Sequence, residues 1–254
     1  MKPPLKTFIA ALVALALIAP ASAMVGGAPE SSSGIAASVI TIVGSRGNFC
    51  SGALIAPDLV LTAAHCLHGN TDTKIVLYDA SRTPMLRDVR RVALHPQFNP
   101  QGIAARRASA DVALLQLSQP LSKPVAALGV PLEPIAAGQS FGIAGIGVTR
   151  PGDGKSGGTV RAAQLVSTSQ PGRLQIRLVD PATQATSAGL GACTGDSGGP
   201  VVQQQSGRAI LVGVVSWSTG PNTTAGCGGL TGVTPLTLYR DWVVQTATGW
   251  GAGL

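Results

Sequence analysis

Short runs of β-branched and aliphatic residues recur along most of the chain, and Gly, Pro, Ser and Asn separate them. Runs of this length between turn residues are typical of β-strands. Many such strands at regular spacing predict an all-β barrel or sandwich. The expected strands are Ser38–Val43, Phe49–Ile55, Leu59–Thr62, Lys74–Tyr78, Val89–Leu94, Val112–Leu117, Phe141–Val148, Val160–Ser167, Leu174–Val179, Val201–Val202 and Ile210–Ser216.

Two segments depart from this pattern. Pro120–Pro134 is rich in proline and separates two halves of similar length, which indicates a linker. Pro235–Thr246 carries the apolar residues Leu238, Trp242 and Val243 at helical spacing behind a Thr-Pro start signal. We therefore expect one helix at the C-terminal end of a β-rich chain.

The N-terminal residues have the pattern of a secretory signal peptide. Lys2 and Lys6 precede the apolar run Phe8–Ile18, and Ala21-Ser22-Ala23 is a small-residue cleavage site. The run is shorter than the roughly 20 residues that a membrane-spanning helix needs, so we expect no membrane anchor. Removal of residues 1–23 would leave a mature chain of residues 24–254, secreted to the periplasm or outside the cell.

The net charge of +7 carries little functional information, because the basic residues are scattered, with Arg82 and Arg106 among them. No basic stripe with interleaved aromatic residues is present, which argues against a nucleic-acid partner. Four cysteines in an exported chain predict two disulfides, and four cysteines allow three pairings.

Three short strings carry the candidate chemistry. LTAAHC places His65 after a strand, ADVALLQL places Asp111 at the start of one, and CTGDSGGP places Ser197 in a glycine-rich turn. A serine hydroxyl needs an adjacent base to become a nucleophile, and a neutral imidazole held by a carboxylate can serve. A sharp turn also lets the N–H groups of Gly195 and Ser197 converge on a developing oxyanion.

These strings, in the order His, Asp, Ser, resemble the chymotrypsin/trypsin family of serine proteases. The resemblance covers essentially all of residues 24–254. It implies two six-stranded antiparallel β-barrels packed together, with a C-terminal α-helix. The first barrel would occupy residues 24–125, and the second barrel with the helix residues 126–254.

The resemblance also assigns structural partners and a substrate-binding segment. It implies the disulfides Cys50–Cys66 and Cys193–Cys227. Ser216 and Trp217 match the family segment that lines the substrate, whose serine hydrogen-bonds the triad aspartate. An extended peptide would pair with that edge as an added strand.

The string MVGG, which begins at Met24, resembles the start of a mature family member. In this family the new α-amine folds inward and pairs with the aspartate before the catalytic serine, here Asp196. Because the expected signal cut would itself expose Met24, export and activation would be a single event. Methionine in place of the family's isoleucine is a departure, although it is apolar and adaptable.

Alignment on Cys193 places Gly191 at the base of the specificity pocket. Gly232 matches the glycine of an open family pocket, and Ser218 stands where many members have glycine and would narrow the pocket. None of these residues supplies a negative charge, so a basic side chain would enter without a partner. We expect an uncharged apolar residue before the scissile bond. The loop over residues 218–226 is longer than is usual in the family.

An active endopeptidase acting on peptides or proteins is the main hypothesis. A protein protease inhibitor is a candidate second partner, and we expect a monomer. The alternative is a catalytically silent protease-fold binding protein, although the chain retains His65, Asp111, Ser197 and Gly195. An esterase with the same machinery is a third possibility. We expect no cofactor and no metal, because His65 and His68 lack a third ligand.

Overall fold

The computed structural model describes residues 24–79, 81, 83–105, 107–168 and 174–254. The expected signal peptide, residues 1–23, lies outside the described residues, as do Arg82 and Arg106. No helix within these described ranges is long and apolar enough to cross a membrane.

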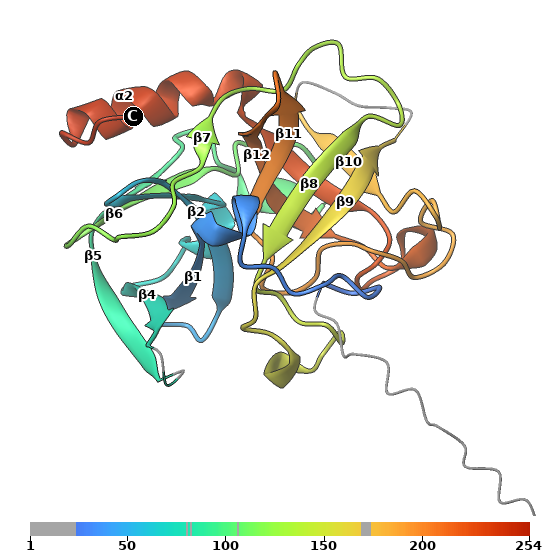
Figure 1. Ribbon diagram of the computed structural model, residues 1–254, viewed down its shortest axis with the longest axis horizontal. Helices are drawn as coiled ribbons and strands as arrows, with labels where there is room; N and C mark the ends of the chain where they lie inside the picture. Colours follow the sequence, from blue (N-terminus) through green and yellow to red (C-terminus); the bar gives the residue numbers. More distant parts are fainter. Residues whose placement is uncertain (1–23, 80, 82, 106, 169–173) are drawn as a thin grey trace, which may run out of the picture.

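Six antiparallel strands close the first barrel in the order β1-β2-β3-β6-β5-β4 (Figure 1). The strands are β1 (Val39–Gly44), β2 (Phe49–Ala56), β3 (Leu59–Thr62), β4 (Thr73–Tyr78), β5 (Pro84–Leu94) and β6 (Ala113–Leu117).

Successive residues of β3 and β6 face different apolar cores. Val60 and Leu115 pack inside the first barrel, whereas Leu61 and Leu114 pack toward the second barrel and the C-terminal helix. Each fully buried aliphatic side chain contributes about 1.5–3 kcal/mol relative to exposure. Because both faces are covered, these strands have largely unbroken apolar sequences rather than alternating ones.

Six further antiparallel strands close the second barrel in the order β11-β8-β9-β10-β13-β12, and the β11–β12 pairing completes the ring. These strands are β8 (Ser140–Gly145), β9 (Arg161–Ser167), β10 (Ile176–Val179), β11 (Pro200–Gln205), β12 (Arg208–Ser218) and β13 (Thr231–Pro235). The structure confirms the predicted pair of six-stranded barrels. It adds β7 (Ala127–Leu128), which pairs in parallel with β12 from within the expected linker.

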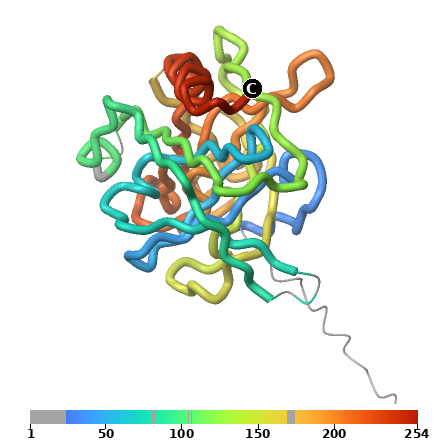
Figure 2. Tube along the Cα trace, turned by 90° about the vertical axis from the view of Figure 1, so that its left-hand side faces the viewer, coloured from blue at the N-terminus to red at the C-terminus, as the bar shows by residue number. Residues whose placement is uncertain are grey.

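The C-terminal helix begins later than its sequence pattern predicts. The long helix is α2 (Arg240–Gly249), whereas Pro235 belongs to β13 and Leu236–Leu238 form a 3₁₀ turn. Pro235 pairs with Gly213 in the sheet, so the chain there is extended. The helix lies at the periphery of the molecule (Figures 1 and 2) and buries Val243 and Ala247. A short helix, α1 (Pro100–Ala104), was not predicted.

The start of the described chain lies along the second barrel. Val25 forms a β-bridge with Gly191, and Glu30 forms one with Arg161. Met24 is fully buried in the apolar core of that barrel, beside residues such as Phe141. The fold therefore brings the first described residues close to the loop that carries Ser197.

Candidate active site

His65 and Asp111 come together from two neighbouring strand ends of the first barrel. His65 lies in the 3₁₀ turn Ala64–Cys66 that follows β3, and Asp111 lies two residues before β6, which pairs with β3. The imidazole Nδ1 lies 2.8 Å from Asp111 Oδ2, and the His65 backbone N–H donates to Oδ1 at 2.9 Å. These paired contacts fix the orientation of the ring.

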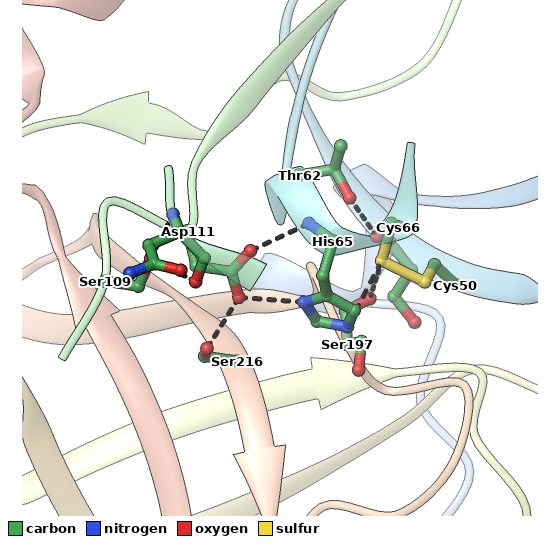
Figure 3. A network of polar contacts seen from close by, with 10 residues as sticks. Cys50, Thr62, His65, Cys66, Ser109, Asp111, Ser197 and Ser216 are labelled. Carbon is green, nitrogen blue, oxygen red and sulfur yellow. Dashed lines mark hydrogen bonds and ion pairs between the residues drawn. A yellow bond between two sulfur atoms is a disulfide. The ribbon is translucent and has the colours of Figure 1, made fainter. Parts of the chain in front are cut away.

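Asp111 is fully buried, and a residue of the second barrel also donates a hydrogen bond to its carboxylate. Ser216 Oγ on β12 donates to Asp111 Oδ2 at 2.6 Å. An ionised carboxylate only accepts hydrogen bonds, so Nδ1 of His65 carries the proton and Nε2 is left as an acceptor. Figure 3 shows the imidazole between Asp111 and Ser197. The Nε2 side of the imidazole ring therefore faces Ser197.

Ser197 lies in a turn that needs glycine both two residues before it and directly after it. Gly195 has φ +97° and Gly198 has φ +78°, both in the left-handed region that favours glycine. A Cβ on Gly195 would also overlap the ring of Phe49. The Ser197 carbonyl accepts a hydrogen bond from the Ser51 backbone N–H at 2.8 Å, which ties this turn to β2.

The backbone N–H groups of Gly195 and Ser197 have no acceptor within the described residues. Gly195, Ser197 and His65 line one cleft with a volume of about 300 Å³. Two unpaired donors beside a nucleophile are the arrangement that stabilises an oxyanion.

Asp196 points away from the cleft into the second barrel and is fully buried. Its carboxylate accepts hydrogen bonds from Gly147 N at 2.8 Å and Cys193 N at 2.9 Å. Burial raises the pKa of this carboxyl to about 7, while the two backbone N–H groups act in the opposite direction. In the described chain the nitrogen of Met24 is a peptide nitrogen, and no hydrogen bond joins it to Asp196.

Of the predicted pocket residues, Trp217 and Ser218 line the cleft, whereas Gly191, Ser216 and Gly232 do not. Trp217 lies directly over Gly232, where an added Cβ would meet its ring, and Ser218 faces Gly226 with a 3.4 Å hydrogen bond. Ser216 is directed to Asp111 rather than into the cleft. Gly191 is enclosed, because its Cβ would lie 3.3 Å from the Gly228 Cα and 3.4 Å from Thr231 Oγ1.

Sequence patterns did not identify two further residues that line this cleft, nor the threonine that holds one of them. Ala192, Val215 and Thr231 are buried apolar or small polar residues. Ala192 and Val215 line the cleft, and Thr231 Oγ1 accepts the Ala192 N–H at 3.0 Å. Alignment to the family pocket was the only available signal, and the unusual 218–226 loop obscured it.

Both expected disulfides are present, Cys50–Cys66 and Cys193–Cys227. The first joins the His65 turn to β2, and the second joins the Ser197 loop to the segment before β13. Cys50, His65 and Cys66 lie close enough to suggest metal ligands. Because the two sulfurs are bonded to each other, they are not thiolate ligands.

A family model described as Trypsin matches residues 24–243. The chain therefore belongs to the trypsin family of serine proteases. It is 35% identical over 218 residues to human "Serine protease 56", covering 77% of this chain and 34% of that protein. It is 28% identical over 198 residues to mouse "Transmembrane protease serine 7", covering 68% of this chain and 22% of that protein.

The chain thus spans about a third or less of the length of these curated relatives. Among solved structures, it is similar to the human heparin binding protein, with a TM-score of 0.70 and 25% sequence identity. That similarity covers 91% of this chain and 100% of the other.

Proposed function

We propose that this chain is an active serine endopeptidase with Ser197 as nucleophile, His65 as general base and Asp111 as the group that orients His65. The observation that carries the proposal is the 2.8 Å contact between His65 Nδ1 and the buried Asp111 carboxylate. It leaves Nε2 of the imidazole free for the hydroxyl proton of Ser197.

In the proposed reaction, Ser197 Oγ bonds to the carbonyl carbon of the substrate while His65 accepts the hydroxyl proton. The N–H groups of Gly195 and Ser197 bind the oxyanion. His65 then donates the proton to the leaving amine as the peptide bond breaks, which leaves an acyl-enzyme on Ser197. Water attacks this ester while His65 accepts a proton from it, and His65 returns that proton to Ser197 Oγ as the ester bond breaks and the acid leaves.

The proposed substrate has an uncharged apolar residue before the scissile bond. Ala192, Val215 and Trp217 line the cleft, and no carboxylate is among the described residues that do so. An arginine or lysine side chain would therefore lose its hydration without gaining a charged partner.

Digestion of a peptide mixture with every residue type before the scissile bond tests this proposal. The mature chain, residues 24–254, is incubated with the mixture, and mass spectrometry identifies the new termini. We expect cleavage after apolar residues, and no cleavage by the matched Ser197→Ala variant. A fluorophosphonate should add once to the wild-type protein and not to the variant.

The outcomes separate the competing functions. Cleavage after arginine with poor cleavage after leucine or phenylalanine would contradict the specificity but not the activity. A correctly folded wild-type chain that neither cleaves peptides nor reacts would favour the silent binding protein. Hydrolysis of esters without peptide cleavage would favour an esterase.

We further propose that the protein is secreted and that the cut after residue 23 activates it. The freed α-amine of Met24 would pair with the Asp196 carboxylate. Two observations support this pairing: Met24 is already fully buried beside the second barrel core, and burial raises the pKa of Asp196 to about 7. A carboxylate that is costly to ionise in isolation would gain most from an ammonium partner.

The mature form should therefore differ from a form with one extra residue before Met24 in its response to pH. In the extended form the folded-state pKa of Asp196 exceeds its unfolded value of 3.8, so stability is lost as pH rises from about 4 through 7. The mature form should keep its stability there and be at least about 100-fold more active at pH 7. Its activity should fall again above the raised pKa of the amine.

Thermal unfolding and kcat of both forms between pH 4 and 9 provide the measurement. Equal activity of the two forms, or parallel melting temperatures across this range, would contradict the Met24–Asp196 pair.

A further inference from the structure

Ser51 is a polar residue in the apolar strand β2, and its side chain is completely buried. A buried hydroxyl destabilises a protein unless it is hydrogen-bonded. Ser51 Oγ donates to the Gly195 carbonyl oxygen at 2.8 Å and accepts the Ile146 N–H at 3.0 Å. The hydroxyl of Ser51 therefore joins two loops that belong to the second barrel.

The Gly195 carbonyl occupies a special place in the oxyanion loop. It belongs to the peptide between Gly195 and Asp196, and the two neighbouring peptides carry the N–H groups of Gly195 and Ser197. The other end of this middle peptide, the Asp196 N–H, donates to the Cys193 carbonyl at 3.0 Å. The middle peptide is thus held at both ends, and its plane sets the directions of both flanking donors.

The same hydrogen bonds connect the oxyanion loop to the segment that holds Asp196. Ile146 donates to Ser51 Oγ, while its neighbour Gly147 donates to Asp196 Oδ1 at 2.8 Å. The two bonds through Ser51 run in series, so each polarises the other. Ser51 therefore lies between the segment around Ile146 and the donors for the oxyanion.

The surroundings of Ser51 leave no room for a substitute group. A Cβ on Gly145 would lie 3.1 Å from Ser51 Oγ, and a Cβ on Gly199 would lie 3.3 Å from Ser51 Cβ. Removing only the hydroxyl leaves too little space for a water, whose share of liquid volume is about 30 Å³. The Gly195 carbonyl and the Ile146 N–H would then both lose their partner.

We propose that Ser51 is a positioning residue that orients the oxyanion hole through the Gly195 carbonyl. This inference rests on the proposed peptidase function. Ser51 does not touch substrate, and its effect is on the transition state, where the two N–H groups bind the oxyanion, more than on the bound substrate.

The test compares Ser51→Ala with wild type on a peptide amide substrate and on a peptidyl trifluoromethyl ketone, which forms an oxyanion when it adds to Ser197. We expect kcat to fall by about 10- to 100-fold, less than or equal to the loss of one direct donor. KM should change by less than about twofold, and the inhibition constant of the ketone should rise in step with the fall in kcat. Ser38→Ala is the matched control: its buried hydroxyl also donates to a backbone carbonyl at 2.8 Å, and Ser38 does not line the cleft.

Ser51→Gly separates positioning from packing and also covers the case in which the alanine variant does not fold. Removal of the whole side chain makes room for one water with two polar partners, Gly195 O and Ile146 N. Positioning predicts a smaller loss of kcat for glycine than for alanine. A purely structural role predicts the reverse, because glycine leaves the larger cavity and a more flexible strand.

Wild-type kcat and inhibitor affinity in Ser51→Ala, or a loss equal to that of Ser38→Ala, would overturn the inference while the peptidase function stands. An increase in KM alone would overturn it as well. A wild-type chain that hydrolyses nothing and does not react with the ketone would overturn the proposed function, and the inference with it. If only Ser51→Gly folds, a rise in KM without a parallel fall in kcat and in ketone affinity would overturn the inference.

Discussion

His65→Ala is expected to lower kcat for a peptide amide substrate by about 10⁶-fold, because the proposed nucleophile, base and orienting carboxylate would act as a unit. Without the imidazole, the Ser197 hydroxyl has no acceptor for its proton at neutral pH. The cleft and the Gly195 and Ser197 donors remain, so binding should persist. KM should therefore change far less than kcat, and some catalysis above the rate in water should survive.

The chain supplies two matched controls for this variant. His68 packs edge-on against Phe98 with ring centroids 5.7 Å apart, and His95 packs against Tyr239 with centroids 5.0 Å apart. Neither lines the cleft that holds Ser197. His68→Ala and His95→Ala should leave kcat within about threefold of wild type, with any loss appearing as lower thermal stability. A comparable loss of kcat in either control would contradict the assignment of His65 as the base.

Local sequence patterns predict the parts of this fold whose signals are local. The glycines around Ser197 indicate a sharp turn within a few residues. The aliphatic runs of β3 and β6 likewise indicate strands that are buried on both faces. By contrast, β13 consists of Thr231–Pro235, a buried strand with little apolar character, and its last two residues, Thr234 and Pro235, have the pattern of a helix start. Its burial comes from β10 and β12 on either side, which no local pattern reports.

Side chains whose role depends on distant partners were missed for the same reason. Ser51 lies in a short strand, and Gly195, whose carbonyl accepts the hydrogen bond from the Ser51 hydroxyl, lies 144 residues later. Thr231 accepts a hydrogen bond from Ala192, 39 residues earlier. The Ser51 hydrogen bond forms only where the two barrels pack together, and the Thr231 hydrogen bond forms only when the second barrel closes, so no local pattern indicates either contact. His65, Asp111 and Ser197 could be predicted from sequence because each lies in a string that resembles the family.

Asp111→Asn is expected to lower kcat by about 10⁴-fold at neutral pH, as this replacement does in Ser-His-Asp triads. Asp111 Oδ1 accepts the His65 backbone N–H, and Oδ2 accepts both the imidazole Nδ1 and Ser216 Oγ. An asparagine oxygen in the first position would place the NH₂ group against Nδ1. The imidazole would then carry its proton on Nε2, which faces Ser197 and could no longer act as an acceptor.

Steady-state kinetics on a peptide amide, with a pH profile of kcat/KM, measure this effect. Because only the tautomer of His65 would change, substrate binding should survive, and KM should stay within about threefold while kcat falls. Ser216→Ala removes only one donor to the same carboxylate and should cost far less, about tenfold. Asp58→Asn is the control for the chemical change itself, since Asp58 accepts a hydrogen bond from Gln116 Nε2 at 2.9 Å and does not line the cleft. If Asp111→Asn kept wild-type kcat, Asp111 would have no role in setting the tautomer of His65, and the buried carboxylate would serve only to hold β6 against the turn that carries the histidine.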